Sequence, residues 1–201
     1  MTAAVLVKAL TLARGAQPLL HNLSFSIHPG ELTVITGRNG IGKSTLLQTL
    51  AKLITPLSGC IEYPAIVPHE IRYLGHLNGL WPLLTVWENA HMIAALQGVR
   101  DTAVVQQALR YFDMEQHQDL FVSHCSAGQK RRLALAQLLY SPGKLWLLDE
   151  PWAALDADAS AKLWQLIQQY LEQQGIICVT SHKTLKHENT AIKEISLMNA
   201  N

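Results

Sequence analysis

The sequence predicts an α/β fold with a helical insertion in its middle third. Near both ends of the chain, short apolar strand patterns alternate with helix patterns, which favours strands joined by crossover helices. The middle third instead carries consecutive helix patterns. At 201 residues, the chain has the length of one domain that buries about 70% of its unfolded surface. Such a core needs neither a disulfide nor a structural metal.

Strand patterns dominate the first third. Runs of β-branched and apolar residues are separated by Gly and Pro punctuation, and one helix-forming run follows a glycine-rich segment. We expect strands at 5–12, 23–27, 31–36 and 71–74, a helix at 44–53, and a turn at Ser58-Gly59.

The middle third contains two capping boxes. In Thr85-Val-Trp-Glu88, the Thr hydroxyl caps one free amide and the Glu carboxylate reaches back to another, so a helix is expected from there to about Gln97. Ser126-Ala-Gly-Gln129 repeats this spacing before a helix at 130–140, and a further helix is expected at 101–111.

The last third returns to alternation. Leu145-Trp-Leu-Leu148 and Ile176-Ile-Cys-Val-Thr180 are continuous apolar runs typical of fully buried strands, with a helix at 156–173 between them. We therefore expect one domain over 1–201, with its core at 1–75 and 141–201 and a helical subdomain at 76–140.

Charge and composition exclude several classes. Sixteen Lys and Arg against fifteen Asp and Glu give a net charge of +1. A dedicated nucleic-acid binder is expected to carry a larger excess of basic residues. Lys130-Arg131-Arg132 points in three directions around a helix and makes no stripe. We expect no secretory signal at the start of the sequence, and the long uncharged stretch 73–87 is interrupted by Gly, His, Asn and Pro. The three scattered cysteines indicate a reducing compartment, and no CxxCH haem motif is present.

A phosphate-binding loop is the strongest local motif. Gly37-Arg38-Asn39-Gly40-Ile41-Gly42-Lys43-Ser44 matches GxxxxGK[ST], directly after a strand and at the start of a helix. The glycines let amides curl around phosphate oxygens, Lys43 can reach the β- and γ-phosphates, and the Ser44 hydroxyl can ligate Mg²⁺. The alternative is an ordinary glycine turn entering a helix.

An acidic pair follows the buried strand at 145–148. The position places Asp149 and Glu150 at the carboxyl edge of the sheet, where ligands of open α/β folds bind. We expect Asp149 to hold Mg²⁺, commonly through water, and Glu150 to polarise an attacking water. Alone, such a pair is more often a solvated turn, and its pairing with the phosphate loop reverses that reading.

Five motifs in one order resemble the ATP-binding cassette (ABC) ATPases over essentially the whole chain. Cys125-Ser-Ala-Gly-Gln129 is similar to the family's LSGGQ signature, Ala153-Ala-Leu-Asp156 to its D-loop, and Thr180-Ser-His182 to its switch histidine. The loop from Gly37 to Thr45 and the acidic pair complete the set. The resemblance implies a P-loop NTPase core of the ABC type, with an antiparallel β subdomain and an inserted helical subdomain.

The resemblance also implies a dimer. In the family, two copies sandwich ATP between the phosphate loop of one and the signature of the other. Ser126, Gly128 and Gln129 would then contact ATP bound by the partner copy, with Asp156 nearby, while His182 senses the γ-phosphate. Taken alone, Ser126 is an ordinary helix cap, although its hydroxyl and the free amides behind it suit an anion.

Three positions depart from the family pattern. His76 stands where a Gln ligand of magnesium and water is usual, and imidazole is a poorer Mg²⁺ ligand than an oxygen. Arg14 lies where an adenine-stacking aromatic is usual, and its guanidinium can stack on a base. Cys125 replaces the first Leu of the signature and behaves as a small hydrophobe.

A narrower resemblance rests on the short length, the variant around His76 and the SAGQKRR signature. These look like the ATPase subunit of the cytochrome c maturation system, often described as a haem exporter. The resemblance implies ATP and Mg²⁺ as cofactors, integral membrane permease subunits as partners, and a peripheral place on the cytoplasmic face of the inner membrane. Gly79-Leu-Trp-Pro-Leu-Leu84 is a candidate contact for the membrane subunit, against the alternative of a buried core loop.

Other functions remain open at this stage. A soluble nucleotide-gated assembly module of the same ATPase class fits the motifs, as does the ATPase of another ABC transporter. The intact acidic pair and His182 favour hydrolysis over a pure switch. A small-molecule kinase or GTPase lacks a guanine-selecting NKxD motif and leaves the SAGQ segment unexplained.

Overall fold

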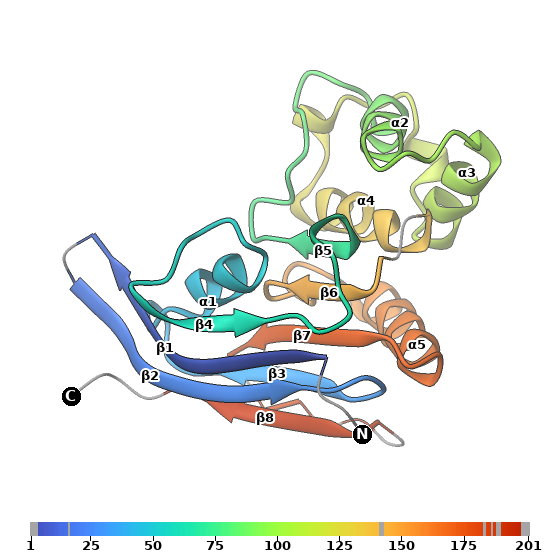
Figure 1. Cartoon of the computed structure of the whole chain (residues 1–201). Helices are drawn as coiled ribbons and strands as arrows, with labels where there is room; N and C mark the ends of the chain where they lie inside the picture. Colours follow the sequence, from blue (N-terminus) through green and yellow to red (C-terminus); the bar gives the residue numbers. More distant parts are fainter. Residues whose placement is uncertain are drawn as a thin grey trace. The chain divides into compact units, whose positions relative to one another are not determined.

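A computed structural model describes residues 4–15, 17–140, 143–182, 184, 185, 187 and 190–197. The chain forms two compact units, and each unit is built from segments that are separate in the sequence (Figure 1). The sheet unit comprises 1–73, 144–150 and 167–201, and the helical unit comprises 74–143 and 151–166. The division expected from the sequence had assigned 151–166 to the core.

The sheet unit is built on a five-stranded sheet with the order β5-β6-β7-β3-β8. The alternation of buried strands and helices predicted this sheet, and the β3–β7, β3–β8 and β6–β7 pairs are parallel. Its strands are β3 (Leu32–Thr36), β5 (Ile71–Leu74), β6 (Leu145–Leu148), β7 (Ile176–Ser181) and β8 (Ile192–Ser196).

β8 is a strand that the sequence analysis did not predict. Its residues Ile-Lys-Glu-Ile-Ser are half-exposed, so the run lacks the continuous apolar pattern of the central strands. It is defined by parallel pairing with β3 over five residues, which is a contact between distant parts of the chain.

A second sheet of three antiparallel strands, in the order β2-β1-β4, belongs to the same unit. Its members are β1 (Val5–Arg14), β2 (Gln17–Ile27) and β4 (Ser58–Glu62). The expected turn at Ser58-Gly59 is wrong, because both residues lie in β4. Gly59 has a φ of 83°, and a Cβ there would lie 2.4 Å from the Ala9 carbonyl oxygen. The glycine therefore serves a bulge, where the β1–β4 register shifts.

Helix α1 (Lys43–Leu50) packs into the core of the sheet unit. Leu46, Leu47 and Leu50 are fully buried and belong to the same apolar cluster as Leu145 and Leu147 of β6. Helix α5 (Ala157–Glu172) contributes residues 157–166 to the helical unit and residues 167–172 to the sheet unit. The core thus fixes α1, and with it the loop that precedes this helix.

The helical unit contains α2 (Val86–Leu96), α3 (Thr102–Tyr111) and α4 (Ala127–Tyr140), with short 3₁₀ turns at Glu115–His117 and Val122–His124. Another 3₁₀ turn, Pro68–Glu70, precedes β5 in the sheet unit. Both predicted capping boxes are confirmed. The Glu88 amide donates to Thr85 Oγ1, and the Gln129 amide donates to Ser126 Oγ.

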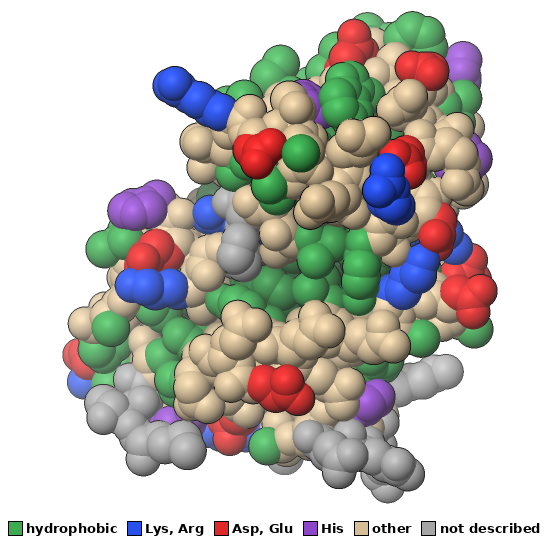
Figure 2. Space-filling model, turned by 90° about the vertical axis from the view of Figure 1, so that its right-hand side faces the viewer, with side chains coloured by type: hydrophobic (Ala, Val, Ile, Leu, Met, Phe, Trp, Pro, Cys, Tyr) green, Lys and Arg blue, Asp and Glu red, His purple; other side chains and the backbone are tan. Residues whose placement is uncertain are grey.

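In the part of the chain that the structure describes, no helix combines the length and apolarity needed to cross a bilayer. On the face drawn in Figure 2, the described acidic and basic side chains lie interspersed, with no broad basic patch. This distribution agrees with the nearly balanced charge of the sequence.

Candidate nucleotide-binding site

The loop between β3 and α1 has the backbone that a phosphate cradle requires. Gly37 has a φ of 149°, and a Cβ there would lie 3.2 Å from the Leu197 carbonyl oxygen. Gly42, the residue before α1, has a φ of 111°. Both positions need glycine. Arg38, Asn39 and Gly40 are exposed, and Ile41 is buried under the loop.

Lys43 lies inside this loop. Its side chain is buried, and Nζ donates to the carbonyl oxygens of Gly37 at 2.8 Å and Arg38 at 3.2 Å. Ser44 and Thr45 follow in the first turn of α1, where helix amides have no intrahelical acceptor. The lysine, the Ser44 hydroxyl and these amides thus meet at the helix N-terminus, which favours anions.

Thr180 of β7 connects the two acidic residues that follow β6. Its hydroxyl donates to Asp149 Oδ1 at 2.6 Å and accepts from the Glu150 amide at 2.9 Å. Asp149 and Thr180 are buried, whereas the Glu150 side chain is 23% exposed. Glu150 has a φ of 47°, a conformation that costs energy in a residue with a side chain.

His182 lies between the acidic pair and the phosphate loop. Its Nε2 lies 2.5 Å from Glu150 Oε1, and its Nδ1 lies 3.3 Å from Lys43 Nζ. Because the ammonium of Lys43 can only donate, Nδ1 is the acceptor and Nε2 carries the proton that faces Glu150. Four sequence-predicted residues therefore meet within the sheet unit: Lys43, Asp149, Glu150 and His182.

The signature segment starts α4 in the helical unit. Ser126 Oγ accepts from the Gln129 amide at 3.1 Å, and Gln129 Oε1 accepts from the Ser126 amide at 2.8 Å. Gln129 thus fixes the cap, while the exposed Ser126 hydroxyl keeps its own proton for donation. Burial raises the pKa of the Cys125 thiol, as expected for a small apolar residue.

The signature packs against the segment that resembles a D-loop. A Cβ at Gly128 would lie 2.8 Å from the Ala154 carbonyl oxygen, so only glycine fits there. Asp156 accepts from the Ala159 amide at 2.9 Å and pairs with Arg132 of α4. The Ala159 amide and then the Arg132 guanidinium hold the pKa of Asp156 below its usual value.

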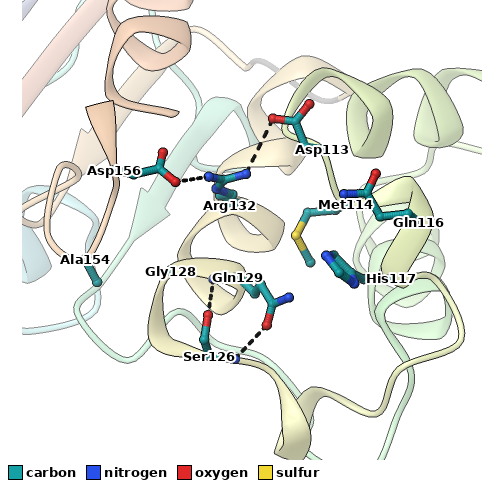
Figure 3. A pocket seen from close by; sticks show the side chains of 10 residues that line it. All are labelled: Asp113, Met114, Gln116, His117, Ser126, Gly128, Gln129, Arg132, Ala154 and Asp156. Carbon is teal, nitrogen blue, oxygen red and sulfur yellow. Dashed lines mark hydrogen bonds and ion pairs between the residues drawn. The ribbon is translucent and has the colours of Figure 1, made fainter. Parts of the chain in front are cut away.

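These residues line a cavity of about 460 Å³ within the helical unit (Figure 3). Ser126 and Gln129 lie at one side, and Asp113, Met114, Gln116 and His117 lie at the other. Arg132 pairs with both Asp113 and Asp156, and Lys162 also pairs with Asp113 at 2.6 Å. The signature therefore opens on a polar hollow rather than on a flat surface.

The structure gives fewer contacts for two other residues that the sequence assigns to the site, His76 and Arg14. His76 belongs to the helical unit and is exposed in the turn after β5. Arg14 ends β1, and its side chain lies outside what the structure describes.

Sequence reasoning did not assign roles to Thr180 and Arg131. Thr180 was visible only as the residue that ends a buried apolar run, two positions before His182. Arg131 appeared as one charge of a basic triplet, yet its side chain is buried, with 3% of the residue exposed.

The donor set fits magnesium. The Asp149 carboxylate and the Ser44 hydroxyl offer oxygen atoms, which Mg²⁺ prefers, whereas thiols and paired imidazoles would favour softer metals. The described residues contain no cluster of three or more His, Cys, Asp or Glu side chains. Mg²⁺ is commonly held by one or two protein oxygens together with substrate phosphates.

A buried lysine inside a glycine loop, an acidic pair ordered from the next strand and a histidine joining them define a nucleoside triphosphatase of the ATP-binding cassette class. The family model described as ABC transporter matches residues 20–153. The chain therefore belongs to the ABC transporter family and is an ATP-hydrolysing member of it.

Two relatives carry the name cytochrome c biogenesis ATP-binding export protein CcmA. The one from Ruegeria pomeroyi is 43% identical over 88% of this chain and 83% of its own length. The one from Escherichia coli K12 is 36% identical over 94% of each chain. These relatives confirm the narrower resemblance expected from the sequence.

The fold likewise matches a solved ABC structure. The ATP-binding cassette MJ0796, in a dimeric post-hydrolysis state bound to ADP and Pi, superimposes with a TM-score of 0.79. The match covers 90% of this chain and 88% of that one at 25% identity. The expected fold of an ABC-type core with antiparallel and helical parts is thereby confirmed.

Proposed function

We propose that this chain is the ATP-hydrolysing subunit of a membrane export complex in cytochrome c biogenesis, and that it works as a nucleotide-sandwich dimer. The observation that carries the proposal is the meeting of Lys43, Glu150 and His182 within hydrogen-bond reach. The CcmA relatives support the biological role, and the dimeric ADP-bound relative supports the assembly.

The loop from Gly37 to Thr45 would hold the phosphates. Its amides and the Lys43 ammonium provide positive charge where the β- and γ-phosphates would lie. Magnesium, when bound, would neutralise developing charge on the phosphate oxygens. Ser44 and Asp149 would hold it, and the Thr180 hydroxyl orients the Asp149 carboxylate for that purpose.

Glu150 would accept a proton from the attacking water. The backbone of this residue is held by Thr180, and its carboxylate is oriented by the protonated nitrogen of His182. Phosphoryl transfer requires little beyond positioning and charge stabilisation, so a fixed carboxylate and a fixed ammonium provide much of the catalysis.

The signature face would close over ATP held by a second copy of the chain. Ser126 can donate a hydrogen bond, the free amides of the first turn of α4 attract an anion, and Gln129 holds the cap. The hollow in front of these groups leaves room for part of a nucleotide. Arg14 would stack on the base, and His76 would take the place of the usual glutamine ligand.

The membrane partner would dock on an exposed apolar patch, defined here as Trp81, Leu83 and Phe121. These residues are 41%, 83% and 47% exposed. Amides of Val122 and Ser123 donate to carbonyl groups of the 82–84 loop, so the two segments lie side by side. The chain would then sit peripherally on the cytoplasmic face of the inner membrane, with integral permease subunits above it.

Purified protein tests the central claim. The full chain should bind Mg-ATP and hydrolyse it, and Glu150→Gln should retain binding while turnover falls by about 10² or more. The glutamine variant should also shift to a dimer in the presence of ATP. Wild-type turnover in Glu150→Gln would contradict the base assignment, and no affinity for ATP would overturn the proposed function.

A further inference from the structure

A buried arginine in the signature helix holds two loops of the helical unit together. Arg131 lies one turn into α4, and only 3% of the residue is exposed. Its Nη1 donates to the Gly75 carbonyl oxygen at 3.0 Å and to Asn78 Oδ1 at 2.8 Å. Its Nε donates to the Pro151 carbonyl oxygen at 3.2 Å.

Each loop begins just after a strand of the five-stranded sheet. β5 and β6 are neighbours in the five-stranded sheet, and the chain passes into the helical unit directly after Tyr73 and again after Glu150. Arg131 donates a hydrogen bond to each loop within two residues of these points, at Gly75 and at Pro151. The first loop includes His76, and the second begins at Pro151, the residue that follows Glu150 in the chain.

The first of these loops contains a tight turn with left-handed backbone. Asn78 has a φ of 60° and is followed by Gly79 with a φ of 64°. The Asn78 amide also donates to the Gly75 carbonyl oxygen at 3.3 Å. Both acceptors of Arg131 Nη1 therefore belong to one tight turn, whose conformation is held by this side chain.

The choice of arginine at this place is itself informative. Burying a guanidinium is costly unless its donors are satisfied, and an apolar side chain of similar volume would pack at lower cost. Arginine offers several donors in a rigid planar fork, so one side chain can fix two separate loops at defined angles.

We propose that Arg131 is a positioning residue of the ATPase reaction, which ties the turn carrying His76 and the backbone after Glu150 to the signature helix. A shift of α4 then moves both loops together. The inference rests on the proposed roles of Glu150 and His76 and adds a link between the signature and the water-activating group of the same chain.

Three variants of the full chain test the link. Arg131→Met removes the donors and keeps an apolar stem, Arg131→Lys keeps the charge without the fork, and Asn78→Gly removes one acceptor while tolerating the positive φ. Arg110→Met is the matched control, because Arg110 is an arginine of α3 with a 65% exposed side chain. For each protein, kcat and KM for Mg-ATP and the thermal midpoint are measured.

Arg131→Met and Arg131→Lys should lower kcat about tenfold or more, since small displacements of reacting groups have effects of this size. KM should change by no more than about threefold, which means that binding is retained. A merely structural role would lower the midpoint and leave the kcat of the folded protein unchanged. Asn78→Gly should lose less, and combining it with Arg131→Met should add nothing further.

A folded Arg131→Met protein with wild-type kcat overturns the inference. If that variant does not fold, wild-type kcat in both Arg131→Lys and Asn78→Gly overturns it equally. Failure of the proposed function looks different, because wild-type protein would then not hydrolyse ATP or Glu150→Gln would retain full turnover.

Discussion

Glu150 Oε1 lies 2.5 Å from His182 Nε2, and the same imidazole reaches Lys43 through its other ring nitrogen. The histidine therefore orients the carboxylate that would activate water and also contacts the lysine that would bind phosphate. We expect His182→Ala to lower kcat by about 10² or more while ATP binding is retained. Steady-state hydrolysis and equilibrium binding of ATP check this. Equal loss of binding and turnover would point to a structural role instead.

Thr180 should be essential for the order of the acidic pair. Thr180→Val keeps the shape of the side chain but removes a donor from Asp149 and the acceptor of the Glu150 amide. We expect the free energy of unfolding to fall by about 1–3 kcal/mol, because buried polar groups lose their partner. The apparent affinity for Mg²⁺ should fall as well. Thr180→Ser should restore both, and urea unfolding with magnesium titration of activity measures them.

Gly128 should tolerate no side chain. The Cβ of Gly128→Ala would lie 2.8 Å from the Ala154 carbonyl oxygen, so α4 or the 154 segment must shift. We expect a folded protein whose turnover falls about tenfold or more, since the capping groups of the signature would be displaced. Ala103→Ser, at the exposed start of α3, is the control. Full activity in Gly128→Ala would show that the contact is not needed.

Asp156 should contribute to acid sensitivity. Its pKa is lowered in the folded chain by the Ala159 amide and by Arg132. A carboxyl group with a depressed pKa stabilises the folded state above its unfolded pKa, about 3.9, and this contribution is lost as pH falls through the lower folded value. Asp156→Asn keeps the cap but loses the ion pair. The difference in urea midpoint between the two proteins should therefore shrink below about pH 4. A constant difference across pH would contradict the assignment.

Trp81 should contribute to partner binding without being needed for folding. The residue is 41% exposed, while its backbone is held by the side-chain amide of the buried Asn89, which accepts from the Trp81 amide and donates to its carbonyl oxygen. Trp81→Asp should keep the thermal midpoint and ATP binding and abolish co-purification with the membrane subunit. Leu57→Asp, at an exposed apolar residue of the sheet unit, serves as the control. Unchanged co-purification of Trp81→Asp would exclude this patch.

The local features of this protein follow from its amino-acid sequence. The glycine loop before α1, the capping boxes at Thr85 and Ser126, and the buried runs of β6 and β7 depend on neighbours within a few residues, so composition and spacing were sufficient to predict them. The order of the five motifs also placed the chain in its family.

The remaining features depend on contacts between distant parts of the chain. β4 and β8 exist through pairing with distant strands, and a bulge glycine was therefore mistaken for a turn. Thr180 contacts Asp149 from 31 residues away in the sequence. Arg131 contacts Gly75 and Pro151, which lie 56 and 20 residues away. No local pattern marks such partners, because the contact forms only once the sheet and the helices have folded and the polar groups must find each other inside them.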